Sequence, residues 1–271
     1  MKLIWVFLFL TLTMTVLACG HDGLDSHPLP RPLIIQYPEM VEFQSNKAGS
    51  DEEELRLECT SWRFAAETNN LSPWDTVPIE CGEYVKEYME GRGYGFDLER
   101  VSKEAGSFAK NFKLNEDGKD AWIFDIDETL LSNLPYYEEH GYGLEIFDRV
   151  EFNKWVEKGM APAIKPSLIL YEEVLKVGFR VFLLTGRSES YMDATVENLK
   201  RVGFQDWDMI ILRGREDHMK HATAFKSEKR EEMVRDGFRI VGNSGDQWSD
   251  LLGSSMSIRS FKLPNPMYFI P

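Results

Sequence analysis

The sequence predicts an α/β protein in which a Rossmann-like, doubly wound parallel sheet follows a helical N-terminal lobe. Four short, mostly apolar runs, at residues 121–124, 181–184, 209–212 and 239–242, alternate with stretches of helical periodicity. Strands of this length that alternate with helices are typical of a parallel sheet covered on both faces. The chain is 43% hydrophobic and 28% charged, which suffices for a sizeable core. Ligands of such sheets bind at the carboxyl ends of the strands, so the residues after each run are the functional candidates.

Residues 1–20 have the pattern of a secretory signal peptide. Lys2 precedes an apolar stretch from residue 3 to residue 17, and the small residues Ala18 and Gly20 follow. We predict cleavage after Gly20; a bacterial lipoprotein signal that ends at Cys19 is the alternative. The stretch is short for a membrane span. We therefore expect a mature protein without a membrane anchor that enters the secretory pathway and ends outside the cell, in the cell wall or in the vacuole.

The charge of the chain restricts its partners. The formal net charge is −14, and removal of the signal peptide takes away only the charge of Lys2. A strongly negative protein repels polyanions, which excludes nucleic acid and anionic membranes as expected partners. We expect a small phosphorylated substrate for the reasons given below. The sequence leaves a homodimer open.

Cysteine usage predicts a disulfide. Without Cys19, two of the three cysteines remain, Cys59 and Cys81, an even pair in an oxidising compartment. A bridge between them would stabilise the fold by about 3 kcal/mol on the chain-entropy model. Two reduced, buried thiols are the alternative. Asn70 begins the pattern Asn-Leu-Ser for N-glycosylation, weakened by the proline that follows it.

The elements before the sheet are expected in two segments. Residues 21–50 contain four prolines without sustained periodicity and are predicted to be an extended arm. Residues 51–118 are predicted to be the helical lobe, with helices that start at residue 51 and cover about 80–89 and 97–112. The acidic residues 51–54 suit a helix start. The pair Cys59 and Cys81 would join the first two of these helices.

The remaining residues, 119–271, are predicted to form the sheet domain. Its helices are expected at about 166–177, 191–202 and 226–236, between the apolar runs. An insert at about 132–165 is predicted to be a small cap that influences substrate choice. Its aromatic rings are equally compatible with an ordinary core. These rings are Tyr136, Tyr137, Tyr142, Phe147, Phe152 and Trp155.

The first two apolar runs end in residues suited to phosphate chemistry. Asp125 and Asp127 follow the first run, so that one carboxylate can attack while the other transfers a proton. Thr185 and Gly186 end the second run, where a hydroxyl and backbone N–H groups can hold phosphate oxygens. In isolation, each motif is better explained as an ordinary loop or turn.

The third and fourth runs add a cation and two more acids. Lys226, which we expect to open a helix, can neutralise charge on a phosphoryl group. Asp246 and Asp250 follow the fourth run and offer oxygen ligands to a small divalent cation, although aspartate is also a common helix cap. His218 and His221 have the spacing of two ligands on one helix face, but without a third candidate we interpret them as surface or structural residues.

In combination, these four elements resemble the haloacid dehalogenase (HAD) superfamily. Its marks are Asp-x-Asp-x-Thr, a Thr or Ser at a strand end, a Lys, and Gly-Asp-x-x-x-Asp, which stand here at residues 125–129, 185, 226 and 245–250. Residues 59–63, 77–81, 211–213 and 242–250 are similar to the plant acid phosphatase and vegetative storage protein branch, subfamily IIIB. The resemblance covers nearly the whole chain from about residue 55.

The resemblance implies a mechanism and a cofactor. Asp125 would attack phosphorus and form a phosphoaspartate, while Asp127 would protonate the leaving oxygen and later accept a proton from water. Mg²⁺ would be held by Asp125, Asp246 and the backbone carbonyl of Asp127. Asp250 would bind the ion directly or orient the site. Thr185, Gly186 and Lys226 would bind the phosphoryl oxygens.

Two other functions stay open at this point. Some relatives in this branch are nitrogen stores that have lost the nucleophilic acid, whereas Asp125, Asp127, Lys226 and Asp246 are all present here. The intact set favours an acid phosphatase over a vegetative storage protein with weak or no activity. Phosphotransfer would use the same residues and cannot be separated from hydrolysis by sequence.

Overall fold

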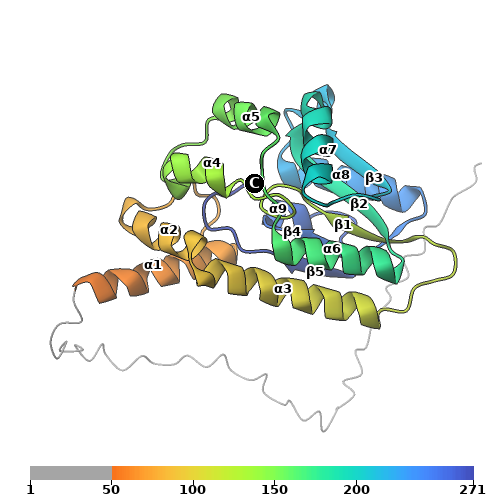
Figure 1. Ribbon diagram of the computed structural model, residues 1–271, viewed down its shortest axis with the longest axis horizontal. Helices are drawn as coiled ribbons and strands as arrows, with labels where there is room; N and C mark the ends of the chain where they lie inside the picture. Colours follow the sequence, from red (N-terminus) through yellow and green to blue (C-terminus); the bar gives the residue numbers. More distant parts are fainter. Residues whose placement is uncertain (1–50) are drawn as a thin grey trace, which may run out of the picture. The chain divides into compact units, whose positions relative to one another are not determined.

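The computed structural model describes residues 51–271, which belong to one compact unit (Figure 1). The predicted signal peptide and arm, residues 1–20 and 21–50, lie outside the described residues. Within residues 51–271, no helix has the length and apolar character needed to cross a membrane.

Five parallel strands form the central sheet in the order β3-β2-β1-β4-β5. The middle strand is β1 (Asp120–Phe124), flanked by β2 (Arg180–Ser188) and β4 (Arg239–Gly245), with β3 (Met209–Arg213) and β5 (Arg259–Lys262) at the edges. The predicted α/β class with a parallel sheet is confirmed. Strand β5 was not predicted, because only Phe261 of its four residues is buried and such a strand has no periodic signal in the sequence.

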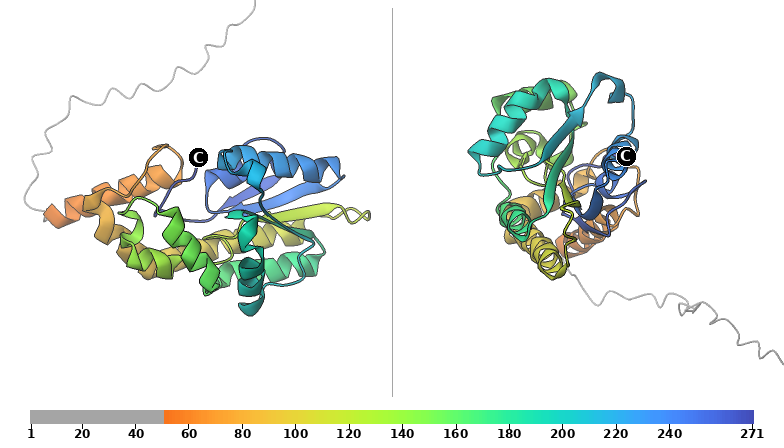
Figure 2. Two further views of the ribbon diagram at one scale, coloured as in Figure 1. Left: turned by 90° about the horizontal axis from the view of Figure 1, so that it is seen from above. Right: turned by 90° about the vertical axis from the view of Figure 1, so that its right-hand side faces the viewer.

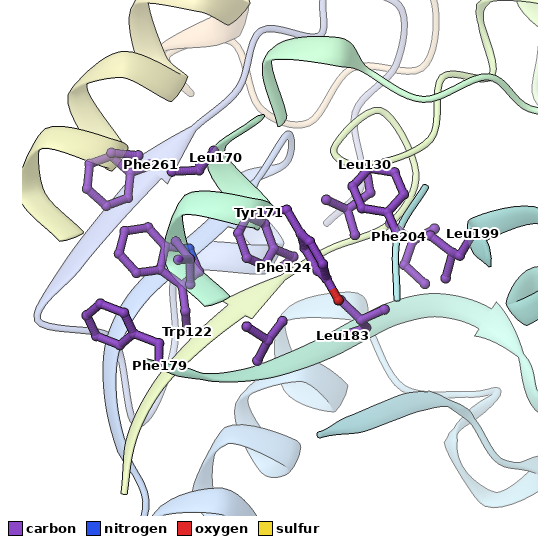
Figure 3. Close-up of a cluster of buried hydrophobic side chains, with 14 of the residues drawn as sticks. Trp122, Phe124, Leu130, Leu170, Tyr171, Phe179, Leu183, Leu199, Phe204 and Phe261 are labelled. Atoms are coloured by element: carbon purple, nitrogen blue, oxygen red, sulfur yellow. The ribbon is translucent and has the colours of Figure 1, made fainter. Parts of the chain in front are cut away.

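Helices cover both faces of the sheet, as the continuous apolar strands predict. Trp122 and Phe124 of β1 point to the face covered by α3 (Arg92–Asn111) and α6 (Lys165–Val177), whereas Ala121 and Ile123 point to the face covered by α8 (Ala222–Arg235). Figure 3 shows the first of these cores. In it Trp122 stacks on Phe261 of β5 at a centroid distance of 5.3 Å. Helix α7 (Met192–Arg201) contributes Leu199 to the same core.

The segment before the sheet is helical, as expected. It contains α1 (Asp51–Glu67), the short η1 (Ile79–Cys81), α2 (Gly82–Glu90) and α3. The predicted disulfide is present: Cys59 of α1 is bonded to Cys81, with the two Cα atoms 5.3 Å apart. Because Cys81 ends η1, the bridge joins α1 to the turn before α2 and not to α2 itself. The predicted boundary at residue 118 stays a prediction, since the described residues form one unit.

The predicted cap insert contains α4 (Leu134–Glu139), η2 (Gly141–Gly143) and α5 (Arg149–Lys158). Figure 1 and Figure 2 show these elements at one end of the sheet, where η2 and α4 lie beside α2 and α5 lies beside α7. The aromatic rings divide between the two roles considered above: Tyr136, Tyr137 and Tyr142 are buried in a core shared with α2, whereas Phe147 is half exposed. A cleft on this side is lined by residues of the cap and the C-terminal segment, including Tyr136, Tyr137, Phe147 and Tyr268.

Two helices begin earlier than their sequence patterns indicate. Helix α3 starts at Arg92 and not at residue 97, because burial of Tyr94 overrides the low helix propensity of Gly93 and Gly95. Helix α8 starts at Ala222, so Lys226 lies in its second turn and does not open the helix. The remaining short elements are η3 (Glu189–Tyr191), η4 (Arg215–Asp217) and α9 (Trp248–Leu251).

Candidate active site

Asp125 directly follows β1 and is buried at the carboxyl edge of the sheet. Its backbone N–H donates to the carbonyl of Ser244 in β4 (2.9 Å), which fixes the chain at this residue. Lys226 Nζ of α8 donates to Asp125 Oδ1 (2.5 Å) and also contacts Asp250 Oδ1. The lysine expected to face a phosphoryl group therefore lies between two of the predicted acids.

Three predicted metal ligands come together. Carboxylate oxygens of Asp125, Asp246 and Asp250 all lie within 4.8 Å of one another, and the three residues are buried. They follow the neighbouring strands β1 and β4. From β1 the chain adds β2 and β3 on one side of the sheet and then β4 and β5 on the other, so the strand order reverses between β1 and β4. Doubly wound sheets bind ligands at this point. A buried set of three carboxylates fits a hard divalent cation such as Mg²⁺ or Ca²⁺.

The second oxygen of Asp246 is fixed by neutral donors. Asp246 Oδ2 accepts hydrogen bonds from Gln247 Nε2 (2.8 Å) and Asn265 Nδ2 (2.7 Å). Its Oδ1 has only a long contact, 3.4 Å, from Thr129 Oγ1. The carboxylate is thereby oriented with one oxygen toward the site, a common arrangement around metal ligands.

Negative charge exceeds positive charge in the interior of the site. Burial, reinforced by Asp250 and Asp246, raises the pKa of Asp125 well above its ordinary value, although Lys226 acts in the opposite direction. Burial and the charge of Asp250 raise the pKa of Asp246 to about 7. A bound divalent cation would offset this repulsion and favour the ionised carboxylates. The electrostatics thus agree with the ligand geometry in fitting a metal ion.

Asp127 lies beside this cluster, and its side chain pairs with a different cation. Arg187 Nη2 donates to Asp127 Oδ1 (2.7 Å), and Arg187 Nε lies 3.1 Å from both carboxylate oxygens. Asn133 Nδ2 also donates to Oδ1 (2.8 Å), and Thr185 Oγ1 to Oδ2 (3.4 Å). Burial would raise the pKa of Asp127, but Arg187 lowers it below its ordinary value. Among the acids predicted as metal ligands, Asp127 is the one whose carboxylate stands outside the cluster of three.

Asp250 is held in place from three directions. A Cβ on Gly245 would lie 2.4 Å from Asp250 Oδ2, so only glycine allows the two residues to approach this closely. The fully buried Arg230 of α8 donates to the Asp250 carbonyl (2.7 Å), as does Asn243 Nδ2 (2.8 Å). Arg230 therefore ties the helix that carries Lys226 to the helix that carries Asp250.

The other predicted residues lie at the end of β2 or on the surface. Thr185 is buried beside Asp127, and Gly186 is exposed at the same strand end. His218 and His221 are exposed, and neither belongs to the acid cluster, which agrees with a surface role. Asn70 is exposed, and its amide donates to Thr68 Oγ1 (2.8 Å).

Four residues without a predicted role support the site: Arg187 and Asn133 bind Asp127, and Glu128 and Tyr268 hold Asn133 in place directly or through each other. Arg187 follows the Thr-Gly pair and Glu128 lies within the Asp-x-Asp-x-Thr motif, so both had a positional signal. Asn133 and Tyr268 had none, because Tyr268 donates to Glu128 Oε2 (2.7 Å) across 140 residues of sequence. Glu128 is fully buried, and burial together with the Asp127 charge raises its pKa to about 7.

The order of the strands and the acids at their carboxyl ends are those of the HAD class. Comparison with known proteins agrees with this. The family model described as HAD superfamily, subfamily IIIB (acid phosphatase) matches residues 43–271. The chain belongs to this family.

Individual relatives point the same way. The chain is 63% identical to Acid phosphatase 1 of Solanum lycopersicum over 97% of its own length and 99% of the relative's. It is 40% identical to Vegetative storage protein 1 of Arabidopsis thaliana over 79% of each chain. Among solved structures, the class C acid phosphatase of Bacillus anthracis with tungstate bound has a similar fold, with a TM-score of 0.53 and 22% identity over 69% of this chain and 85% of that one.

Proposed function

We propose that this protein enters the secretory pathway and is a Mg²⁺-dependent acid phosphatase that hydrolyses phosphate monoesters through a phosphoaspartate on Asp125. The observation that carries the proposal is the position of Asp125, which is buried in contact with Lys226 and has a carboxylate oxygen within 4.8 Å of those of Asp246 and Asp250. A carboxylate that attacks a phosphate dianion meets like-charge repulsion, which a lysine and a divalent cation offset. Membership of the acid phosphatase family supports the reaction class.

The other residues have defined parts in this reaction. Asp127 lies beside Asp125 in the sequence and in the site, and in this proposal it protonates the leaving oxygen and then accepts a proton from the attacking water. Thr185, Gly186 and Lys226 bind the phosphoryl oxygens. Asp125, Asp246 and Asp250 hold the metal ion together with the Asp127 backbone carbonyl; the ion supplies positive charge at the phosphoryl group.

Secretion and glycosylation belong to the same proposal. The disulfide between Cys59 and Cys81 supports an oxidising compartment, in agreement with the signal peptide predicted at residues 1–20. The exposed position of Asn70 makes its amide accessible to glycosylation. Proteins of the cell exterior, the cell wall and the vacuole all enter the secretory pathway through such a signal peptide.

A storage role is the second candidate, because vegetative storage proteins are among the relatives. The experiment that separates the two is hydrolysis of an aryl phosphate by the mature protein from acid to neutral pH, with and without Mg²⁺, beside Asp125→Asn. We expect Mg²⁺-dependent turnover that is lost in the variant. A folded, Mg²⁺-bound wild-type protein without turnover would overturn the enzyme proposal and favour storage.

A further inference from the structure

Asn133 is the only described residue whose side chain bridges Asp127 and Glu128 by hydrogen bonds. It is completely buried at the start of the cap, six residues after Asp127. Its Nδ2 donates to Asp127 Oδ1 (2.8 Å) and to Glu128 Oε2 (3.1 Å). Both hydrogens of the amide are therefore committed to carboxylates.

The orientation of this amide is fixed by the cap. Trp155 Nε1 of α5 donates to Asn133 Oδ1 (2.9 Å). An indole N–H can only donate, so the oxygen of the amide must face Trp155 and the NH₂ group must face the acids. A rotated amide would set two donors against each other in a buried place, which is costly.

Glu128 fixes the backbone of Asn133 in turn. Its Oε1 accepts the backbone N–H of Asn133 (2.5 Å), and its Oε2 accepts the hydroxyl of Tyr268 (2.7 Å). Tyr268 stacks on Tyr137 of α4 at 5.2 Å. Glu128 itself has φ of 50°, a strained value for a residue with a side chain, and these contacts hold it there. The cap and the C-terminal segment thus meet at Asn133.

The two oxygens of Asp127 differ because of this arrangement. Oδ1 accepts two short hydrogen bonds, from Asn133 and from Arg187 Nη2 (2.7 Å). Oδ2 has only longer contacts, from Arg187 Nε (3.1 Å) and Thr185 Oγ1 (3.4 Å). Oδ2 is therefore the less tightly held oxygen of Asp127, the one that can exchange its longer contacts for a proton.

We propose that Asn133 is a positioning residue that reserves Asp127 Oδ2 for proton transfer to the leaving group. This inference rests on the proposed function. The negative charge of the bound phosphate opposes that of Asp127 and favours uptake of a proton on Asp127 Oδ2. As the bond between phosphorus and the leaving oxygen breaks and a carboxylate oxygen of Asp125 bonds to phosphorus, this proton passes to the leaving oxygen; Asp127 regains a proton from the water that attacks the phosphoaspartate. Asn133 touches neither atom that reacts; it acts through the orientation of Asp127.

The test uses the dependence of kcat/KM on the leaving group. Nitrophenol leaves readily without protonation, whereas an alkyl alcohol needs a proton, and a general acid contributes about 10²–10⁴-fold to such steps. For Asn133→Ala we expect kcat/KM with an alkyl phosphate to fall about ten-fold or more beyond its fall with nitrophenyl phosphate. Across a series of aryl and alkyl phosphates, the plot of log kcat/KM against leaving-group pKa should steepen.

Asn198→Ala is the matched control. Asn198 of α7 is also a buried asparagine with a fully bonded amide, but its partners are the backbone N–H and carbonyl of Ala161. We expect this variant to lower kcat/KM equally for all leaving groups, if at all. Trp155→Phe removes the indole N–H that orients Asn133 but keeps an aromatic side chain. We expect the plot of log kcat/KM against leaving-group pKa to steepen less than in Asn133→Ala.

Equal losses for all leaving groups in Asn133→Ala and Trp155→Phe would overturn the inference and reduce Asn133 to a structural residue. If Asn133→Ala does not fold, as judged by circular dichroism, Trp155→Phe alone decides. Failure of the proposed function looks different: the wild-type protein would then hydrolyse no phosphate ester at all.

Discussion

Asp127 and Asp246 follow different strands, but both are oriented by side-chain hydrogen bonds that favour one carboxylate oxygen. In each carboxylate one oxygen accepts the two shortest side-chain hydrogen bonds, and the contacts of the other oxygen are longer. For Asp246 the donors are the amides of Gln247 and Asn265. For Asp127 they are Asn133 and the guanidinium of Arg187. The protein thereby determines which oxygen of each acid is presented to a metal ion or to a substrate.

Asn265→Ala tests this orientation at the metal site. The variant removes the 2.7 Å hydrogen bond to Asp246 Oδ2, and we expect Mg²⁺ affinity to fall about 10–100-fold, the usual effect of losing a partner that orients a ligand. Isothermal titration calorimetry with Mg²⁺ measures the affinity directly. Asn115→Ala is the control, because Asn115 also orients a buried aspartate, Asp120, but at the opposite end of β1. Equal affinity in both variants would contradict the orienting role.

At the scale of elements, the sequence predicted what lies at the strand ends and missed what crosses between elements. Asp125, Asp127, Asp246 and Asp250 were predictable because parallel strands are continuous apolar runs and their carboxyl ends converge. Lys226 lies in α8 and was identified through the order of the motifs, not through a strand end. The contacts of these residues were not predictable, because their partners are set by packing.

Two residues illustrate the limit. Asn133 lies close to the motif in sequence, but its role depends on Trp155 of the cap. Tyr268 reaches Glu128 only because the C-terminal segment packs against the cap, where Met267 joins the same core as Tyr137. No local pattern carries such information. Arg187 is a different case: it directly follows the predicted pair Thr185 and Gly186, but only the fold shows that it faces Asp127.

The disulfide provides a prediction for the helical elements. Replacing both Cys59 and Cys81 by serine removes the bridge between two residues that are 22 positions apart in the sequence. We expect the free energy of unfolding to fall by about 3 kcal/mol, because the unfolded chain is no longer restricted by a closed loop. Phosphatase activity at 25 °C should stay within about two-fold, because neither cysteine contacts the site. Denaturant unfolding followed by tryptophan fluorescence measures the first effect. Loss of activity in a variant that remains folded would show that the bridge shapes the site itself.

At the scale of the whole molecule, acidic residues outnumber basic ones, and several of the acids are gathered in the active site. The chain carries a net charge of −14, and the site buries more acids than cations. The buried carboxylates are Asp125, Glu128, Asp246 and Asp250, with the partly buried Asp127 beside them, and Lys226 and Arg187 are the cations that contact this set. A protein that only stores nitrogen has no need to bury such a set, because unneutralised buried charge destabilises the fold. The intact cluster therefore favours the enzyme over the store.

The same excess predicts how stability depends on pH. In the folded protein the pKa values of Glu128 and Asp246 are raised to about 7, above their unfolded values. Between about pH 4, where these groups titrate in the unfolded chain, and about pH 7, the folded state binds more protons than the unfolded state. The contribution of the two groups to stability is therefore complete below about pH 4 and is lost as the pH rises toward 7. Asp117, with its pKa lowered to about 2 beside Arg239, does not titrate in this range. For protein freed of metal by EDTA, we expect the free energy of unfolding to fall by at least about 1 kcal/mol from pH 5 to pH 7.5.

Mg²⁺ should reverse this trend, because the cation binds the ionised carboxylates and its stabilisation grows as they lose their protons. We expect the increase in Tm on adding Mg²⁺ to be larger at pH 7.5 than at pH 5, as measured by differential scanning fluorimetry. Asp246→Asn is the control: its amide can keep the hydrogen bonds from Gln247 and Asn265 while removing one charge. The variant should show a shallower pH dependence without metal and a reduced response to Mg²⁺. A wild-type response to Mg²⁺ that is equal at both pH values would mean that the buried acids do not form the metal site.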